Sequence, residues 1–220
     1  MQKKTFCFRS ELELPSQTFV ELYMNLREKS LEVRQVFAEL DIEIKVFMEE
    51  SQLSCISGCG ACCANPNVHA SVLEFLPLAF DLYEKGKAEK ALELLEEVGE
   101  EAFCIIYKSF SQDAKSGFCS DYANRGMICR LFGSAARRNK EGKKELITCK
   151  IIKEQKADLY QRTVQVIKEG AVVPSSGDAY SQLYNIDFQL TKEQFPINVA
   201  IKKALEAVLT YMFYTENNEV

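Results

Sequence analysis

Hydrophobic residues recur at helical spacing along most of this chain. Ser16, which follows Pro15, is placed to cap a helix. The apolar positions after it are separated mainly by three or four residues: Phe19, Leu22, Leu26, Val33, Phe37, Leu40, Ile44 and Phe47. This pattern predicts one long amphipathic helix, or two, with the apolar stripe packed against the body of the protein. About two heptads of alternating spacing are too few to indicate a coiled coil.

Further helices are predicted downstream. The stretches SVLEFLPLAFDLYEKG and KAEKALELLEEVGEEAFCIIYKSF have helical patterns, with Gly86 as the stop between them. Segment 151–168 has Ile152, Leu159, Thr163 and Val166 on one face, and segment 196–213 has Ile197, Ile201, Leu205, Val208 and Met212. A strand is indicated only at 145–148, after the charged turn RRNKEGKK. Pro174, Gly177 and Pro196 punctuate 171–196, which we expect to be a long ordered loop.

The predicted fold class is mostly α: a single helical domain with irregular cysteine-rich loops around a metal centre. It comprises an N-terminal helical segment (1–54), a cysteine-cluster region (55–150) and C-terminal helices on the same domain (151–220). The 220 residues are 47% hydrophobic and 27% charged, which is enough for a sizeable core. No apolar run reaches the length of a signal peptide at the amino terminus or the roughly 18 residues of a membrane span elsewhere. We therefore expect a soluble, cytoplasmic protein with no membrane partner.

Cysteine is the unusual residue of this sequence. In a reducing compartment, nine cysteines are not expected to form a disulfide framework, so their thiols are available to metals. Thiolates prefer zinc, copper(I) and iron–sulfur clusters over magnesium or calcium. We expect Gly58 and Gly60 to take positive φ and turn backbone N–H groups toward the sulfurs. The candidate ligands are Cys55, Cys59, Cys62 and Cys63 in the stretch CISGCGACC, followed by Cys119, Cys129 and Cys149, whereas Cys7 and Cys104 are expected to be small core residues.

The spacing of the first cysteines differs from that of the known ferredoxin motifs. The bacterial ferredoxin run is absent, and the plant-type spacing is missed by one residue. Cys55, Cys59 and Cys62 have the CxxxCxxC spacing of radical S-adenosylmethionine enzymes. In those enzymes the motif follows the first strand of a β/α barrel, whereas here it follows a predicted helix and no alternating strands and helices come after it. A radical enzyme is therefore kept as a lesser alternative.

A second motif points to a family. The stretch GFCSDYANRGMICRLF contains Gly117, Cys119, Tyr122, Arg125, Cys129, Arg130 and Phe132. Together with the CxxxCGACC loop, it resembles the YkgJ-type cysteine-cluster family of zinc- or iron-chelating domains, and flagellin lysine-N-methylases carry a similar cluster. The resemblance covers about 55–150 and implies metal binding without specifying a reaction. Family members commonly have Arg-Pro where this chain has Arg125-Gly126, and Cys149 could match a further downstream cysteine of the family.

The residue types suggest roles around the centre. A closed zinc site needs four ligands, and this chain offers up to seven clustered thiols, so an iron–sulfur cluster is preferred and zinc stays open. Arg125 and Arg130 could offset the negative charge of a thiolate centre and donate hydrogen bonds to sulfur, or they could form ordinary ion pairs. Tyr122 could shield the site or be a core tyrosine. His69, the single histidine, is interpreted as structural rather than as a ligand.

Charge restricts the partners. The formal net charge of -5 makes nucleic acid an unlikely partner. A local basic run is the exception to this negative charge and is interpreted as a solvated hairpin. It consists of Arg130, Arg137, Arg138, Lys140, Lys143, Lys144 and Lys150. Two function classes remain. One is a redox or electron-transfer role with a redox or protein partner, which as an enzyme would be an iron–sulfur oxidoreductase or methylase-like. The other is a non-catalytic zinc-binding structural or metal-handling role.

Overall fold

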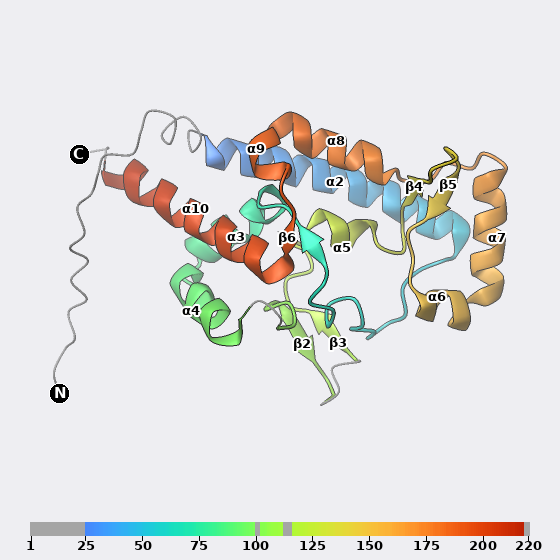
Figure 1. Ribbon diagram of the computed structural model, residues 1–220, viewed down its shortest axis with the longest axis horizontal. Helices are drawn as coiled ribbons and strands as arrows, with labels where there is room; N and C mark the ends of the chain where they lie inside the picture. Colours follow the sequence, from blue (N-terminus) through green and yellow to red (C-terminus); the bar gives the residue numbers. More distant parts are fainter. Residues whose placement is uncertain (1–24, 100–101, 112–115, 218–220) are drawn as a thin grey trace.

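The computed structural model describes residues 25–99, 102–111 and 116–217, and most of them lie in helices (Figure 1). The helices are α2 (Leu26–Ser51), α3 (Leu76–Glu84), α4 (Ala88–Val98), α5 (Met127–Leu131), α6 (Lys150–Gln155), α7 (Ala157–Lys168), α8 (Ser176–Ile186), α9 (Phe188–Thr191) and α10 (Ile197–Asn217), with a 3-10 turn η1 at Leu73–Phe75. Paired short strands connect them: β1 (His69–Ala70) with β6 (Phe195–Pro196), β2 (Tyr107–Ser109) with β3 (Gly117–Cys119), and β4 (Ala136–Arg138) with β5 (Lys144–Leu146). The mostly α prediction is confirmed.

Helix α2 is the longest element and crosses the molecule from one end to the other (Figure 1). Its buried side chains follow the predicted stripe and include Leu26, Val33, Phe37, Leu40, Ile44 and Phe47. The stripe packs against the rest of the protein, as expected for an amphipathic helix at the edge of a core. The earlier part of the predicted helix, from Ser16, lies outside the described residues, and so does Cys7.

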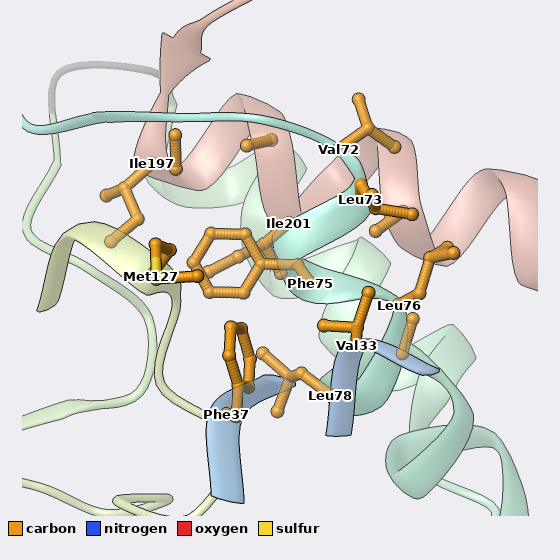
Figure 2. Packing of buried hydrophobic residues seen from close by; sticks show 14 of the residues in the cluster. Val33, Phe37, Val72, Leu73, Phe75, Leu76, Leu78, Met127, Ile197 and Ile201 are labelled. Atoms are coloured by element: carbon orange, nitrogen blue, oxygen red, sulfur yellow. The ribbon is translucent and has the colours of Figure 1, made fainter. Parts of the chain in front are cut away.

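The main core forms where α2, α3, α5 and α10 meet η1. Figure 2 shows Phe75 at its centre, between Met127 of α5, Ile201 of α10 and Phe37 of α2, and all four side chains are buried. The predicted apolar face of α10 is confirmed, since Ile197, Ile201, Leu205, Val208 and Met212 are all buried. Gly86, with a φ of 63°, separates α3 from α4 as predicted.

A second, smaller core lies at the end of the molecule formed by β4, β5, α6 and α7 (Figure 1). Its buried members are Phe47, Leu53, Ala136, Leu146, Ile152, Ile167 and Val173. The predicted helix over 151–168 is divided into α6 and α7 at Lys156. Within α7 the buried side chains are Thr163 and Ile167, four residues apart, whereas Val166 is exposed, which corrects the predicted face.

Two other sequence-based expectations are wrong. Segment 171–196 is not a long loop, because Ser175 accepts a hydrogen bond from the Asp178 amide as an N-cap and opens α8, whose Ala179 and Leu183 are buried one turn apart. Of the residues expected to punctuate a loop, Pro174 lies just before that cap and Gly177 lies inside the helix. The helix predicted to run on through Phe110 ends at Val98, because Gly99 has a φ of 75°.

The hairpin of β4 and β5 confirms the predicted charged turn and half of the strand predicted at 145–148, because β5 ends at Leu146. Arg137 and Arg138 on β4 and Lys144 on β5 are exposed, and Arg137 pairs with Glu145 across the hairpin at 3.4 Å. Arg130 does not belong to this solvated run, because it is 3% exposed inside the protein. Among the described residues, no helix is long and apolar enough to cross a bilayer.

Candidate metal centre

The cysteine-rich loop leaves the end of α2 and is attached to the β2–β3 hairpin. Gly58 has the positive φ expected for it, 71°, and its carbonyl oxygen accepts a hydrogen bond from the Gly117 amide at 2.9 Å. Cys59 forms an isolated antiparallel bridge with Ser116. The loop therefore extends the edge of the hairpin, and this attachment brings Cys59 toward Cys119, three residues beyond Ser116.

Gly60 has a different role from the one expected. Its φ is not positive; instead, a Cβ at this position would collide with the ring and hydroxyl of Tyr107. Tyr107 is buried and lies opposite Cys119 in the β2–β3 pair. Glycine is thus required at position 60 for close approach of the loop to the hairpin, not for a left-handed turn.

We expect Gly60→Ala to destabilise the protein by about 1–3 kcal/mol, as overpacking of a well-packed interior does. The measurement is urea unfolding followed by circular dichroism. The matched control is Gly177→Ala in α8, where the nearest atom to the added Cβ is the Ser175 hydroxyl at 3.8 Å and the substitution should not destabilise. Equal free energies of unfolding for the two variants would contradict this role of Gly60.

Cys104 joins the same region through its backbone. Its amide donates to the Cys63 carbonyl at 3.3 Å, and its carbonyl accepts from the Tyr107 amide at 2.8 Å. Cys104 is 6% exposed, so the expectation of a buried core thiol is confirmed. Sequence spacing gave no indication that this thiol lies next to the cysteine loop.

Two further elements, α5 and α6, position Cys129 and Cys149. Cys129 is in the middle of α5 and packs on the main core. Cys149 caps α6, and its sulfur accepts a hydrogen bond from the Ile152 amide at 3.4 Å. Lys156, just after α6, donates to the Ser54 carbonyl at 2.8 Å and to its hydroxyl at 3.0 Å. These bonds tie α6, and Cys149 with it, to the residue that precedes Cys55.

The thiols differ in exposure: Cys55 and Cys62 are exposed, Cys104 is buried, and the other described cysteines lie between these extremes. Burial raises the pKa of Cys55, of Cys119 and of Cys129, and it raises the pKa of Cys104 to about 12. A hydrogen bond from Cys63 lowers the pKa of Cys62 to about 6 and raises that of Cys63. Desolvation disfavours thiolates, so without a cation most of these groups stay neutral.

The described cysteines influence one another's ionisation in two groups. One group joins Cys55 to Cys59, Cys62 and Cys149. The other group consists of Cys62, Cys63, Cys104, Cys119 and Cys129. Cys62 belongs to both, so all eight described cysteines form one connected set. His69 lies on β1 outside this set, exposed, with Nδ1 2.9 Å from the Asn67 carbonyl oxygen.

The donor chemistry of this set fits a metal centre. Clustered thiols are suitable ligands for zinc or iron, and a bound cation reverses the penalty that partial burial imposes on thiolates. Within the described ranges, no three Cys, His, Asp or Glu side chains lie close enough together to hold one ion as they are placed. The backbone thus brings the thiol-bearing segments together, and binding requires the side chains to converge.

Arg125 and Arg130 are anchored on helix α2. Arg125 donates to one carboxylate oxygen of Asp41 at 3.2 Å, and Arg130 donates to the other. Arg125 also lies over the Tyr122 ring, with 3.6 Å from its guanidinium carbon to the ring centroid. Tyr122 itself is 66% exposed, so it is not a core tyrosine. These contacts are ion pairs and stacking within the protein, and sequence inspection did not single out Asp41 as their partner.

The same arginines also act on the thiols. The charge of Arg125 counters the burial that raises the pKa of Cys119, and the charge of Cys129 counters the burial that lowers the pKa of Arg130. Two guanidinium groups therefore share one carboxylate near the cysteine cluster, while the charges of Asp121 and Glu74 act in the opposite direction on Cys119 and Cys129. Of these charges, those of the arginines favour thiolates over thiols.

Comparison with known proteins agrees with the site. Residues 54–166, just over half of the chain, match the model of the CxxCxxCC family, which is described as a "putative zinc- or iron-chelating domain". The matched range contains the cysteine loop, the β2–β3 hairpin, α5 and the β4–β5 end through most of α7. Neither the curated proteins nor the solved structures that were searched contain a match. The chain belongs to the CxxCxxCC family of zinc- or iron-chelating domains.

Proposed function

We propose that the protein binds metal through a thiolate centre and that this centre is an iron–sulfur cluster. The candidate ligands are Cys55, Cys59, Cys62, Cys63, Cys119, Cys129 and Cys149. The observation that carries the proposal is that backbone contacts bring thiols of the loop, the β2–β3 hairpin, α5 and the start of α6 toward one another, most of them half-buried. Such a set is costly to bury without a ligand and has the donor chemistry that iron and zinc prefer.

Two observations favour an iron–sulfur cluster over a single zinc ion. The thiols outnumber the four ligands of a closed zinc site, so a polynuclear centre uses them more fully. Arg125 and Arg130, which share Asp41, interact with Cys119 and Cys129, where their charge would offset part of the negative charge of a cluster held by four thiolates. When bound, such a cluster would supply one-electron chemistry, and the residues of this chain would hold it and tune its potential.

The second candidate is a structural zinc site. Cys55 and the three thiols that influence its ionisation, Cys59, Cys62 and Cys149, would supply the four ligands of a closed tetrahedral site once their side chains converge. It would connect the loop after α2 to the start of α6 without any need for catalysis. A radical S-adenosylmethionine enzyme is not supported, because the described chain is helical with only two-stranded ladders and matches a different family.

The experiment that separates the two candidates is anaerobic purification with elemental analysis and an absorption spectrum. We expect brown protein containing iron and acid-labile sulfide, with broad charge-transfer absorption from sulfur to iron. The double variant Cys119→Ser/Cys129→Ser is the control and should lose both the colour and the iron. A colourless preparation with stoichiometric zinc would end the preference for iron and support the structural site.

A further inference from the structure

Glu74 is a fully buried carboxylate that the cysteine motifs do not include. It lies in η1 with 0% exposure, and burial raises the pKa of its carboxyl group. One carboxylate oxygen accepts hydrogen bonds from the Ser71 amide at 2.8 Å and from the Ser71 hydroxyl at 3.0 Å. The other accepts from the Ile128 amide of α5 at 3.3 Å. A carboxylate held in this way connects two segments that are 54 residues apart.

The bond to Ile128 replaces a missing cap. Helix α5 has five residues, too few to be stable alone, and its N-cap residue is Gly126, which has no side chain to accept a hydrogen bond. In most helices the N-cap side chain accepts from the second or third amide of the first turn. Ile128 is the second residue of α5, so Glu74 performs this task from a distant part of the chain.

Gly126 makes this arrangement possible. A Cβ at position 126 would lie 2.9 Å from the Phe75 ring and 3.1 Å from the Glu74 carboxylate oxygen that accepts from the Ile128 amide. The backbone of Gly126 is extended, with φ -64° and ψ 169°, so the glycine is not needed for its conformation. Its value is the space that lets the carboxylate reach the start of the helix.

The residue that follows Ile128 is Cys129, a candidate ligand. Its side chain interacts with the charges of Glu74, Cys62, Cys104 and Cys119. The rest of α5 is held by Met127, which packs beside Phe75 in the main core, and by Arg130, which bonds Asp41 (Figure 2). Glu74 thus holds the N-terminal end of α5, and the position of this end determines the direction of the Cys129 thiol.

We propose that Glu74 is a positioning residue of the metal centre, which caps α5 so that the Cys129 thiol faces the other cysteines. This inference rests on the proposed function, because it assumes that Cys129 binds the metal. Outer residues that orient a ligand affect metal affinity by roughly 10- to 100-fold. Ser71 supports the same carboxylate and should contribute less, since it acts on Cys129 only through Glu74.

The test is anaerobic titration of the metal-free full chain with Co²⁺, whose absorption reports thiolate ligands. Glu74→Gln keeps the size of the side chain but turns one acceptor oxygen into a donor that faces the Ser71 or the Ile128 amide. We expect Co²⁺ affinity to fall by roughly 10- to 100-fold and charge-transfer absorption per bound ion to decrease, because one thiolate is misplaced. Ser71→Ala should show the same changes to a smaller extent.

The matched control is Val72→Ala. Val72 precedes η1, is buried in the main core and makes no side-chain hydrogen bond, so its truncation lowers stability without touching the cap. Unchanged Co²⁺ affinity and absorption in Glu74→Gln, or equal changes in Val72→Ala, would overturn the role of Glu74. If Glu74→Gln does not fold, the comparison of Ser71→Ala with Val72→Ala decides the question. A wild-type chain that binds no Co²⁺ and contains neither iron nor zinc after anaerobic purification would instead remove the proposed function itself.

Discussion

Serine at Cys59, Cys62, Cys119 or Cys129 should remove most of the bound metal. These residues belong to the two cysteine motifs, whose segments are joined by backbone contacts between the loop and the β2–β3 hairpin. Two of them, Cys62 and Cys129, also interact with several other thiols. Loss of a direct ligand should cost more than the roughly 10- to 100-fold in affinity that supporting residues contribute. The measurement is metal per chain, by elemental analysis of anaerobically purified single variants.

The remaining cysteines provide graded comparisons. Serine at Cys55, Cys63 or Cys149 should have intermediate effects, because these thiols lie at the margin of one group or serve a second role, as Cys149 does in capping α6. Cys7→Ser is the control and should keep full metal content. Cys104→Ser should lower the free energy of unfolding and keep more metal than Cys119→Ser. If Cys104→Ser empties the site while Cys119→Ser leaves it full, the proposed ligand set is wrong.

Removal of the metal should lower the melting temperature of the protein. A ligand that binds only the folded state stabilises it by about 2.7 kcal/mol when present at 100 times its dissociation constant, and a tightly held centre contributes more. Here the centre would join segments as far apart in the sequence as the 55–63 loop and Cys149, which increases the loss on removal. The measurement is thermal unfolding by circular dichroism, under anaerobic conditions, before and after chelation.

The control for this experiment is the double variant Cys119→Ser/Cys129→Ser. It should melt at the lower temperature from the start, and chelation should leave that temperature unchanged. A wild-type melting temperature that does not respond to chelation, in a sample shown to contain metal beforehand, would argue against coupling between the centre and the fold.

Periodicity predicted the long helices well, because a long apolar stripe at helical spacing is visible in the local sequence. The stripes of α2 and α10 are buried at the expected positions. The prediction was wrong at α8, where Pro174, Ser175 and Gly177 were interpreted as loop residues. A serine after a proline is equally suited to cap a helix, and the buried contacts of Ala179 and Leu183 decide between the two, which local sequence does not show.

The cysteines of the candidate site could be predicted from the sequence, but the residues that hold the neighbouring segments, Glu74 and Asp41, could not. The motifs identify the cysteines because metal ligands must recur at short spacings. Glu74 and Asp41 escape notice because acidic residues on helices usually face water, and their roles depend on partners more than 50 residues away. The density of cysteines in CISGCGACC can be recognised from the sequence alone, whereas a single buried carboxylate cannot.

The placement of the cysteines on two separate cores has a consequence for how the protein unfolds. Cys63, Cys104 and Cys129 pack against the main core, and Cys149 packs against the smaller core at the β4–β5 end. Two packing units of this kind can open independently, with different local free energies. A centre that takes ligands from both units makes them cooperative, so the loaded protein should unfold as one unit. In the empty protein the β4–β5 end is expected to exchange its amide hydrogens before the main core does.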